Sequence, residues 1–217
     1  WTRLRLLSTL GTLAHDDPDL ATRELIRTKA RWGRSGFDLV ATMQASAEAM
    51  LALYRDDQRA CQALLPGYEP FFKSVLSGMP LLRGNALLMR ARLALAAARA
   101  SDAREALCLG AEDDARAAAS LGLACFEHHV RLIRAGAAAR RGDLDTAQAV
   151  LSLVLADRGD QPDVAFTVAA AERRLGALQG GEPGRMLVAR ADAALRAQGV
   201  ENPEAFIRLF APGFDSG

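Results

Sequence analysis

Apolar residues recur at steps of three or four along nearly the whole chain, with polar residues at the positions between them. Two segments show the pattern most clearly: Leu144, Ala147, Leu151 and Val154 in the first, and Val164, Val168, Ala171, Leu175 and Leu178 in the second. Such steps place side chains on one face of an α-helix, the face that packs against the rest of the protein. The pattern therefore predicts a chain of amphipathic helices.

Clusters of Asp, Gly and Pro interrupt these periodic segments. They fall at residues 15–19, 33–36, 54–57, 77–80, 100–102, 140–143, 158–163, 180–184 and 199–203. Asp favours the start of a helix, Gly favours its end, and Pro cannot continue one. We therefore expect about ten helices with short connections, so that sequence neighbours run antiparallel.

Four of the expected helix starts share a pattern, in which a small residue follows an Asp after four positions. The Asp residues are Asp17, Asp57, Asp102 and Asp143, and the small residues are Ala21, Cys61, Ala106 and Ala147. The starts lie 40, 45 and 41 residues apart, and the best internal match joins residues 55–65 to residues 141–151. Helix-pair repeats of about this length are typical of α-solenoids.

We therefore predict an all-α fold, an α-solenoid of about four to five antiparallel helix pairs similar to tetratricopeptide or HEAT repeats. The repeats are expected over residues 1–180, and C-terminal capping helices over residues 181–217. The period exceeds the roughly 34 residues of a standard tetratricopeptide unit, which predicts longer helices. A non-repeating helical bundle is the alternative.

Composition agrees with this fold class and limits the partners. Aromatic residues make up only 6% of the chain, and its Ala, Leu, Arg and Glu are good helix formers. The net charge of +1 does not favour nucleic acid or an anionic membrane. No apolar run approaches the roughly 18 residues of a membrane span, and we recognise no signal peptide. We expect a cytoplasmic protein, and a piece of a longer one because Trp1 begins inside a helical pattern.

The three cysteines give no sign of chemistry. Cys61, Cys108 and Cys125 are odd in number, far apart, and each lies among Ala and Leu. Free cysteines are usually buried, and a redox or metal site would need closely paired cysteines. We expect three reduced, buried thiols.

The sequence GGEPGR at residues 180–185 resembles a phosphate-binding loop only at first sight. A P-loop follows a buried strand and continues with Lys and then Ser or Thr, and a dinucleotide loop needs GxGxxG. None of these features is present. We instead expect a helix corner, where Gly180 or Gly181 ends one helix while Glu182 and Pro183 begin the next.

Histidines and carboxylates also lack catalytic spacing. His128 and His129 are adjacent and therefore point about 100° apart on a helix, so they cannot chelate one metal ion. We expect packing or surface roles for them and for His15, and a solvated helix face for residues 112–114. We predict no catalytic residue, cofactor or metal.

One candidate binding surface remains on the first complete helix. Arg23, Arg27, Arg31 and Arg34 follow one another at steps of four, four and three, and so share one face. Such a basic stripe can hold an acidic peptide or a phosphate group by charge-assisted hydrogen bonds. It is also what the solvated face of an amphipathic helix looks like.

The C-terminal region carries a family resemblance. Its features are Arg-Arg-Leu-Gly at 173–176, Gly-Gly at 180–181, Ala-Gln-Gly at 197–199, Asn-Pro at 202–203 and Ala-Pro-Gly-Phe at 211–214. Residues 170–214 thereby resemble the C-terminus of large multidomain bacterial serine/threonine protein kinases, especially those of myxobacteria. Segments 31–39, 53–57 and 87–98 also look like the tetratricopeptide-like tail of such kinases. The resemblance implies a kinase domain N-terminal to this chain, whose catalytic residues are absent here.

Three functions follow as hypotheses. The leading one is a non-catalytic regulatory region of a bacterial signalling kinase that binds a protein or peptide on the concave surface of the solenoid. The alternative is a small-molecule sensor, which requires a closed, mainly apolar pocket with a few convergent polar groups. An enzyme would need a polar cluster assembled from distant helices, which spacing does not reveal.

Overall fold

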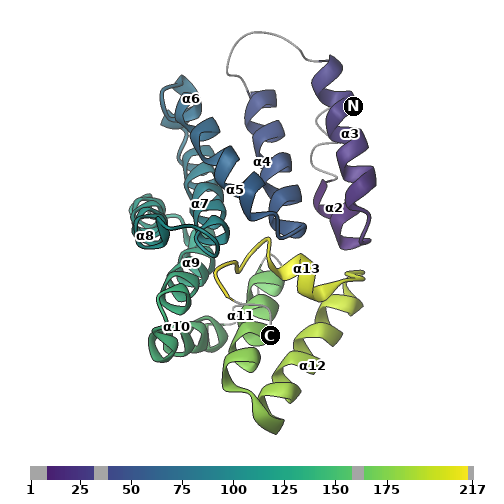
Figure 1. Ribbon diagram of the computed structural model, residues 1–217, viewed down its shortest axis with the longest axis vertical. Coiled ribbons are helices and arrows are strands. Elements are labelled where there is room, and N and C mark those ends of the chain that lie inside the picture. Colours follow the sequence, from purple (N-terminus) through teal and green to yellow (C-terminus); the bar gives the residue numbers. More distant parts are fainter. Residues whose placement is uncertain (1–8, 32–38, 158–163, 215–217) are drawn as a thin grey trace.

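The computed structural model describes residues 9–31, 39–157 and 164–214. Within these ranges every regular element is a helix, and the chain has the all-α fold that the hydrophobic pattern predicts (Figure 1). The longer helices are α2 (Thr9–Ala14), α3 (Pro18–Arg31), α4 (Leu39–Tyr54), α5 (Gln58–Leu64), α7 (Pro80–Ala97), α8 (Arg104–Ala119), α9 (Glu127–Arg140), α10 (Leu144–Ala156), α11 (Ala165–Gln179) and α12 (Gly181–Ala197).

Short elements fill the connections. These are η1 (Leu65–Tyr68), α6 (Glu69–Phe72), η2 (Val75–Gly78), η3 (Ala124–Phe126) and α13 (Pro203–Ile207), where η marks a 3₁₀ helix. Most helix boundaries follow the predicted interruptions, although those at 33–36 and 158–163 lie outside the described residues. Two breaks were not predicted: the one after Leu64, where α5 gives way to η1, and the one between Ala119 and Glu127 that separates α8 from α9.

Helices pack in chain order. Each long helix contacts the next one along the sequence, except that α5 is followed by α7 through the short elements between them. Alternate helices also touch in succession and form one row, which we call the inner row: α2, α4, α7, α9 and α11. The remaining long helices, α3, α5, α8, α10 and α12, each pack beside their partner in this row.

The repeated Asp starts are confirmed at three positions. Asp17, Asp57 and Asp143 each accept a hydrogen bond from the backbone N–H three residues later, at 2.7, 2.9 and 3.1 Å. This interaction satisfies one of the N–H groups that a helix leaves free at its first turn. The small residues four positions after them are all buried: Ala21, Cys61 and Ala147.

The fourth start was wrong. Helix α8 begins at Arg104, with Ala103 rather than Asp102 at the capping position, and Ala106 is exposed. The other three turns each contain a residue with positive φ directly before the Asp, at 50°, 53° and 84° for Asp16, Asp56 and Gly142. The turn before α8 has no such residue, and the Ser101 hydroxyl accepts the Ala103 N–H instead, at 3.1 Å. The helix therefore starts one residue later than predicted, and the buried position is Cys108 rather than Ala106.

The corner at residues 180–184 joins two helices, as predicted. Gly180 and Gly181 have φ values of 63° and 60°, a conformation that favours glycine, and α12 begins immediately with Glu182 in its first turn. A Cβ atom at Gly184 would lie 2.3 Å from the Gly176 carbonyl oxygen, so α11 and α12 approach closely here. The glycines serve this helix packing.

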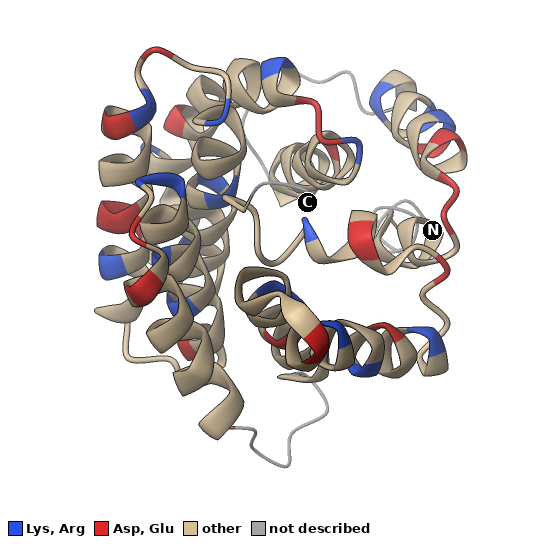
Figure 2. Cartoon of the chain, turned by 60° about the horizontal axis from the view of Figure 1, so that its bottom comes forward, with Lys and Arg blue, Asp and Glu red and all other residues tan. Residues whose placement is uncertain are grey.

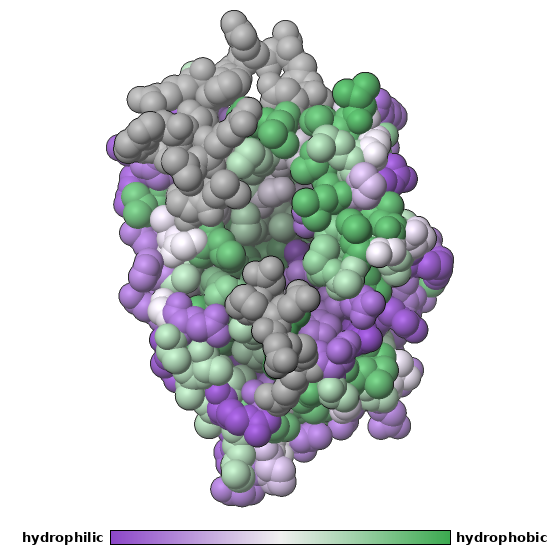
Figure 3. All heavy atoms as spheres, turned by 180° about the vertical axis from the view of Figure 1, so that it is seen from behind, coloured by the Kyte–Doolittle hydropathy of each residue, from purple (hydrophilic) through white to green (hydrophobic). Residues whose placement is uncertain are grey.

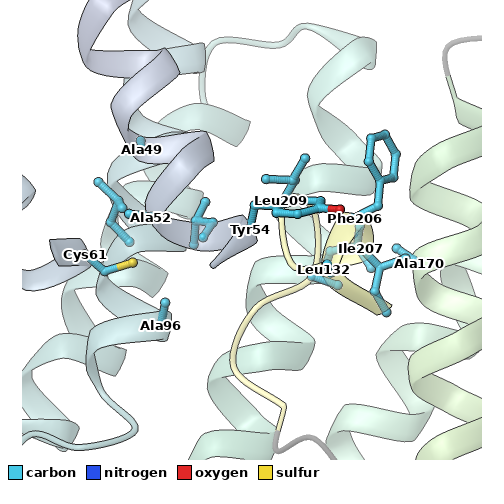
Figure 4. Close-up of a cluster of buried hydrophobic side chains, with 14 of the residues drawn as sticks. Ala49, Ala52, Tyr54, Cys61, Ala96, Leu132, Ala170, Phe206, Ile207 and Leu209 are labelled. Carbon is cyan, nitrogen blue, oxygen red and sulfur yellow. The ribbon is translucent and has the colours of Figure 1, made fainter. Parts of the chain in front are cut away.

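The C-terminal segment, residues 202–214, turns back across the inner row. The Arg208 guanidinium donates to the Tyr54 carbonyl oxygen at 3.0 Å, and Arg174 Nε donates to the Ala211 carbonyl oxygen at 3.2 Å. Figure 4 shows Phe206, Ile207 and Leu209 of this segment among side chains of α4, α9 and α11. The segment thus joins helices from both ends of the chain (Figure 1).

Candidate functional site

A cavity of about 480 Å³ lies between α4 and α7, and we call it the inner-row cavity. Residues of α2, η1 and α6 complete its wall, and most of the lining is apolar: Leu10, Met43, Met50, Phe71, Leu82 and Met89. Seen from behind, hydrophobic side chains gather in the upper half of the molecule, where α4 and α7 lie in Figure 1 (Figure 3). Cavities of this volume are typical of small-molecule sites.

One face of α7 supplies much of this wall. Leu82, Asn85, Met89 and Arg92 follow one another at steps of three and four and line the cavity. Ala96 continues the same face, Arg99 follows just beyond the end of α7, and both lie beside the C-terminal segment instead. One face of α7 therefore borders the cavity over most of its length and the C-terminal segment at its end.

Two polar side chains are buried at the cavity wall. Tyr68 is 4% exposed and Arg92 is 7% exposed. The Tyr68 hydroxyl and the Arg92 Nε atom have no hydrogen-bond partner among the described residues. Arg92 Nη2 lies 2.9 Å from His129 Nδ1. Buried polar groups in native proteins are usually hydrogen-bonded, so unpartnered groups at the wall of a cavity call for an explanation.

Burial governs the protonation of these groups. It lowers the pKa of Arg92 to about 10, so the guanidinium stays charged at neutral pH. Burial, with the nearby charge of Arg92 and the imidazole of His128, lowers the pKa of His129 to about 3. His129 is therefore neutral and accepts a hydrogen bond from Arg92 without cancelling its charge. Burial also raises the pKa of Tyr68, whose hydroxyl remains a neutral donor.

No carboxylate of the described residues pairs with Arg92. Glu48 is near enough to raise the pKa of Tyr68, but its carboxylate forms an ion pair with Lys29. By contrast Arg90, two residues before Arg92, makes a two-pronged interaction with Asp114 at 2.8 and 2.6 Å. A buried charge without a partner is energetically costly.

The cavity is connected to the C-terminal segment through His129. The His129 ring stacks on Phe210, with ring centroids 6.3 Å apart and planes inclined by 15°. Phe210 in turn contacts Phe206 and Phe166 at centroid distances of 5.6 and 5.8 Å. Arg92 thus lies between the cavity and an aromatic cluster that includes the C-terminal segment.

The predicted arginine stripe lies elsewhere, on α3. Arg23 and Arg27 are exposed, and Arg27 pairs with Glu24 at 2.9 Å. Arg31 ends α3, and its side chain and the whole of Arg34 lie outside the described residues. Figure 2 shows basic and acidic positions interspersed along the helices. Neither Arg23 nor Arg27 lines the inner-row cavity.

The histidines have packing and surface positions, as predicted. His128 is buried and its Nδ1 atom lies 3.2 Å from the Thr167 hydroxyl. His15 is exposed and lies 3.6 Å from Glu201. Within the part of the chain that the structure describes, no group of three or more His, Cys, Asp or Glu side chains is arranged to hold a metal ion.

Two sequence expectations were wrong at single residues. Cys125 is exposed, since it belongs to η3 in the connection between α8 and α9, whereas Cys61 and Cys108 are buried. Asp114 is buried rather than solvated, because it faces α7 and pairs there with Arg90. Its neighbours Glu112 and Asp113 do form outer ion pairs, with Arg141 and Arg116 respectively.

Sequence reasoning missed Arg92 and Tyr68. A signal was present for Arg92, because it continues the stripe of Leu82 and Met89 on α7. Tyr68 lies in a 3₁₀ helix outside the regular helical pattern and gives no such signal.

Comparison of the chain with models of protein families, with curated proteins and with solved structures finds no match. None of the described helices is long and apolar enough to cross a membrane.

Proposed function

We propose that this chain is a non-catalytic, tetratricopeptide-like helical-repeat region that senses a small molecule bound in the inner-row cavity. The observation that carries the proposal is the cavity itself, a mainly apolar space of about 480 Å³ with a few polar groups at its wall. The order of helix contacts and the repeated Asp caps support a solenoid of stacked pairs.

A small ligand fits the inner face better than a long peptide does. A peptide bound along a solenoid needs an open concave surface. Here the C-terminal segment occupies the part of the inner row formed by α9, α11 and the end of α4. A Cβ atom added to Gly136 would lie 2.3 Å from the Pro212 carbonyl oxygen, which leaves no room between α9 and this segment.

We further propose that the region belongs to a bacterial signalling serine/threonine kinase, whose activity the bound molecule changes. The support is the resemblance of residues 170–214 to the C-terminus of such kinases. The test is to express the parent protein and measure its phosphorylation rate with and without a ligand of the cavity. A parent that contains no kinase domain contradicts this part of the proposal.

Ligand binding is tested by thermal denaturation with a broad metabolite library, using the wild type and Ser46→Leu. Ser46 lines the cavity and its hydroxyl donates only to the Thr42 carbonyl oxygen of its own helix, at 3.0 Å. Leu at this position fills part of the cavity without breaking a long-range contact. The matched control is Ser152→Leu, because exposed Ser152 makes the same kind of bond, to the Gln148 carbonyl oxygen at 2.8 Å.

We expect some compounds to raise the melting temperature of the wild type and of Ser152→Leu but not that of Ser46→Leu. A flat response of the wild type across the library contradicts the sensor function. Compounds that stabilise all three proteins equally bind outside the cavity.

A protein partner remains the second candidate, because exposed apolar side chains gather at the start of α7. Val75, Met79 and Leu81 are 93%, 54% and 54% exposed, and exposed apolar patches often mark interaction surfaces. The triple replacement of these residues by Ser leaves the cavity lining intact. A partner that binds the wild type and not this variant supports the second function, and equal binding to both removes this patch as its basis.

A further inference from the structure

We infer that the ligand of the inner-row cavity is an apolar molecule with one carboxylate group, which pairs with Arg92 and accepts a hydrogen bond from the Tyr68 hydroxyl. This inference rests on the proposed sensor function and adds the chemical class of the ligand. It starts from the Tyr68 hydroxyl and the Arg92 Nε atom, two polar groups of cavity-lining residues that have no hydrogen-bond partner in the part of the chain that the structure describes.

The charge of Arg92 selects an anion. Arg92 is 7% exposed, and the hydrogen-bond partner of its guanidinium is the neutral ring of His129. A cationic ligand would be repelled there, and a neutral ligand would remove water from the guanidinium without compensating its charge. A carboxylate supplies the opposite charge and matches the planar donor pattern of arginine.

Tyr68 adds a second donor to the same site. Tyr68 is 4% exposed, is one of the residues that line the cavity, and is near enough to Arg92 for that charge to affect its pKa. A neutral phenol donates to an anion and so strengthens the pairing with Arg92. Glu48 is paired with Lys29, so it does not already supply the acceptor.

The remainder of the wall selects an apolar body. Met43, Met50 and Met89 contribute flexible side chains, and Phe71 contributes an aromatic ring. Methionine adapts to the shape of its neighbours, which suits an alkyl chain better than a rigid polar molecule. A medium-length fatty acid combines such a chain with one carboxylate.

The test compares decanoate with decanol, which has the same chain and no charge. Both are titrated calorimetrically into the full chain, into Arg92→Met and into Arg83→Met. Arg83 lies on the same helix and its guanidinium rests on Phe72 outside the cavity lining, 5.9 Å from the ring centroid, so it is the matched control for lost charge.

We expect decanoate to bind the wild type about tenfold or more tightly than decanol, the ratio that a hydrogen-bonded charge pair confers. Arg92→Met should remove this preference, and Arg83→Met should keep it. Equal binding of the two probes to the wild type, binding of decanol alone, or a preference that survives Arg92→Met overturns the inference.

A second variant covers the case in which Arg92→Met does not fold. Tyr68→Phe removes a hydroxyl that bonds no described residue, so the fold should persist. Its affinity for decanoate should fall several-fold and its affinity for decanol should not change. Unchanged affinity for both probes overturns the role of Tyr68.

The failure of this inference is distinct from the failure of the sensor function. One outcome is that decanoate fails to bind while some library compounds stabilise the wild type and not Ser46→Leu. In that case the cavity binds a ligand of another class, and the inference of a carboxylate ligand is wrong. If the library also gives no compound, the sensor function itself fails.

Discussion

Arg92 and Arg174 are two buried arginines on neighbouring parts of the inner row, and their surroundings differ. Burial lowers the pKa of each to about 10. Arg174 reaches the Glu204 carboxylate at 3.4 Å and the Ala211 carbonyl oxygen at 3.2 Å, and its guanidinium lies 5.4 Å from the Phe214 ring centroid. Arg92 is bonded to the neutral ring of His129.

The difference shows how this scaffold accommodates a buried charge. At Arg174 the chain brings its own acid, carbonyl and aromatic ring, all three from the C-terminal segment. The C-terminal segment therefore supplies the groups that compensate this buried charge of the inner row. At Arg92 no described residue plays this part, and the wall beside it encloses a cavity. The same kind of side chain thus serves stability in one place and, in the function proposed above, ligand binding in the other.

The largest expected effect comes from removing the partner of Arg174. Glu204→Gln leaves Arg174 and its neighbour Arg173 with less opposite charge, and we expect a loss of about 3 kcal/mol in the free energy of unfolding. Arg92→Met should change this free energy little or raise it, because no carboxylate of the described residues pairs with the charge it removes and its bonded partner His129 is neutral. Urea denaturation measures the free energy of unfolding of both variants. Equal losses would mean that the two arginines do not differ in how their charge is compensated.

The exposed pair of Glu182 and Arg185 provides the control. Glu182→Gln should change stability by less than about 0.5 kcal/mol, because exposed ion pairs contribute little. A larger loss of stability in Glu182→Gln would show that removing a charge destabilises the protein whether or not the charge is buried.

Gly136→Ala should loosen the C-terminal segment. The new Cβ atom would lie 2.3 Å from the Pro212 carbonyl oxygen, so backbone must shift, at a cost of about 1–3 kcal/mol. Gly110→Ala is the control, since it lies in α8 with nothing within 4 Å, and should be neutral or stabilising. Melting temperatures and the rate of proteolysis within residues 202–214 measure the effect, and equal results for the two variants would contradict close packing at Gly136.

Overpacking a helix pair should lower stability by a similar amount near the N-terminal end of the inner row and near its C-terminal end. We expect this although one part of the row borders the cavity and the other borders the C-terminal segment. Ala21→Leu and Ala147→Leu each overpack a buried contact, and both should destabilise by about 1–3 kcal/mol. Ala106→Leu should have little effect, because Ala106 is exposed. Thermal unfolding tests all three, and an unchanged melting temperature for Ala147→Leu would place it away from a helix contact.

The smallest contrast concerns two tyrosines. The Tyr54 hydroxyl donates to the Asp16 carboxylate, whereas the Tyr68 hydroxyl bonds none of the residues that the structure describes. Tyr54→Phe should cost about 1–2 kcal/mol, and Tyr68→Phe should cost nothing measurable without a ligand. Chemical denaturation of the two variants makes the comparison, and a similar loss in both would show that Tyr68 does have a partner.

Much of the fold was predictable because helix formation depends on nearby residues. The steps of three and four around Leu151 and Val154, the caps at Asp57 and Asp143 and the corner at Gly180 are all local signals. The start of α8 was mispredicted because Ala103 takes the capping position with no side-chain capping bond, while the Ser101 hydroxyl accepts the Ala103 N–H, and nothing in the local sequence signals this arrangement.

The candidate site was not predictable in the same way. Arg90 and Arg92 look alike in the sequence, both within an apolar helix. They differ only because Asp114 on α8 meets one of them, while the other turns toward α4 and the cavity. Similar side chains on one helix thus acquire different surroundings, because each faces a different neighbouring helix.

The sequence by itself determined the all-α class, the position of most helices and the packing of small residues such as Ala147, because these follow from periodicity and capping within a few turns. Only the tertiary structure decided that residues 202–214 return to the inner row, where Arg208 bonds the carbonyl of Tyr54, a residue 154 positions earlier. It likewise decided that Arg92 is buried at a cavity without an acid beside it. Contacts between distant residues depend on how whole helices pack, and no local pattern encodes them.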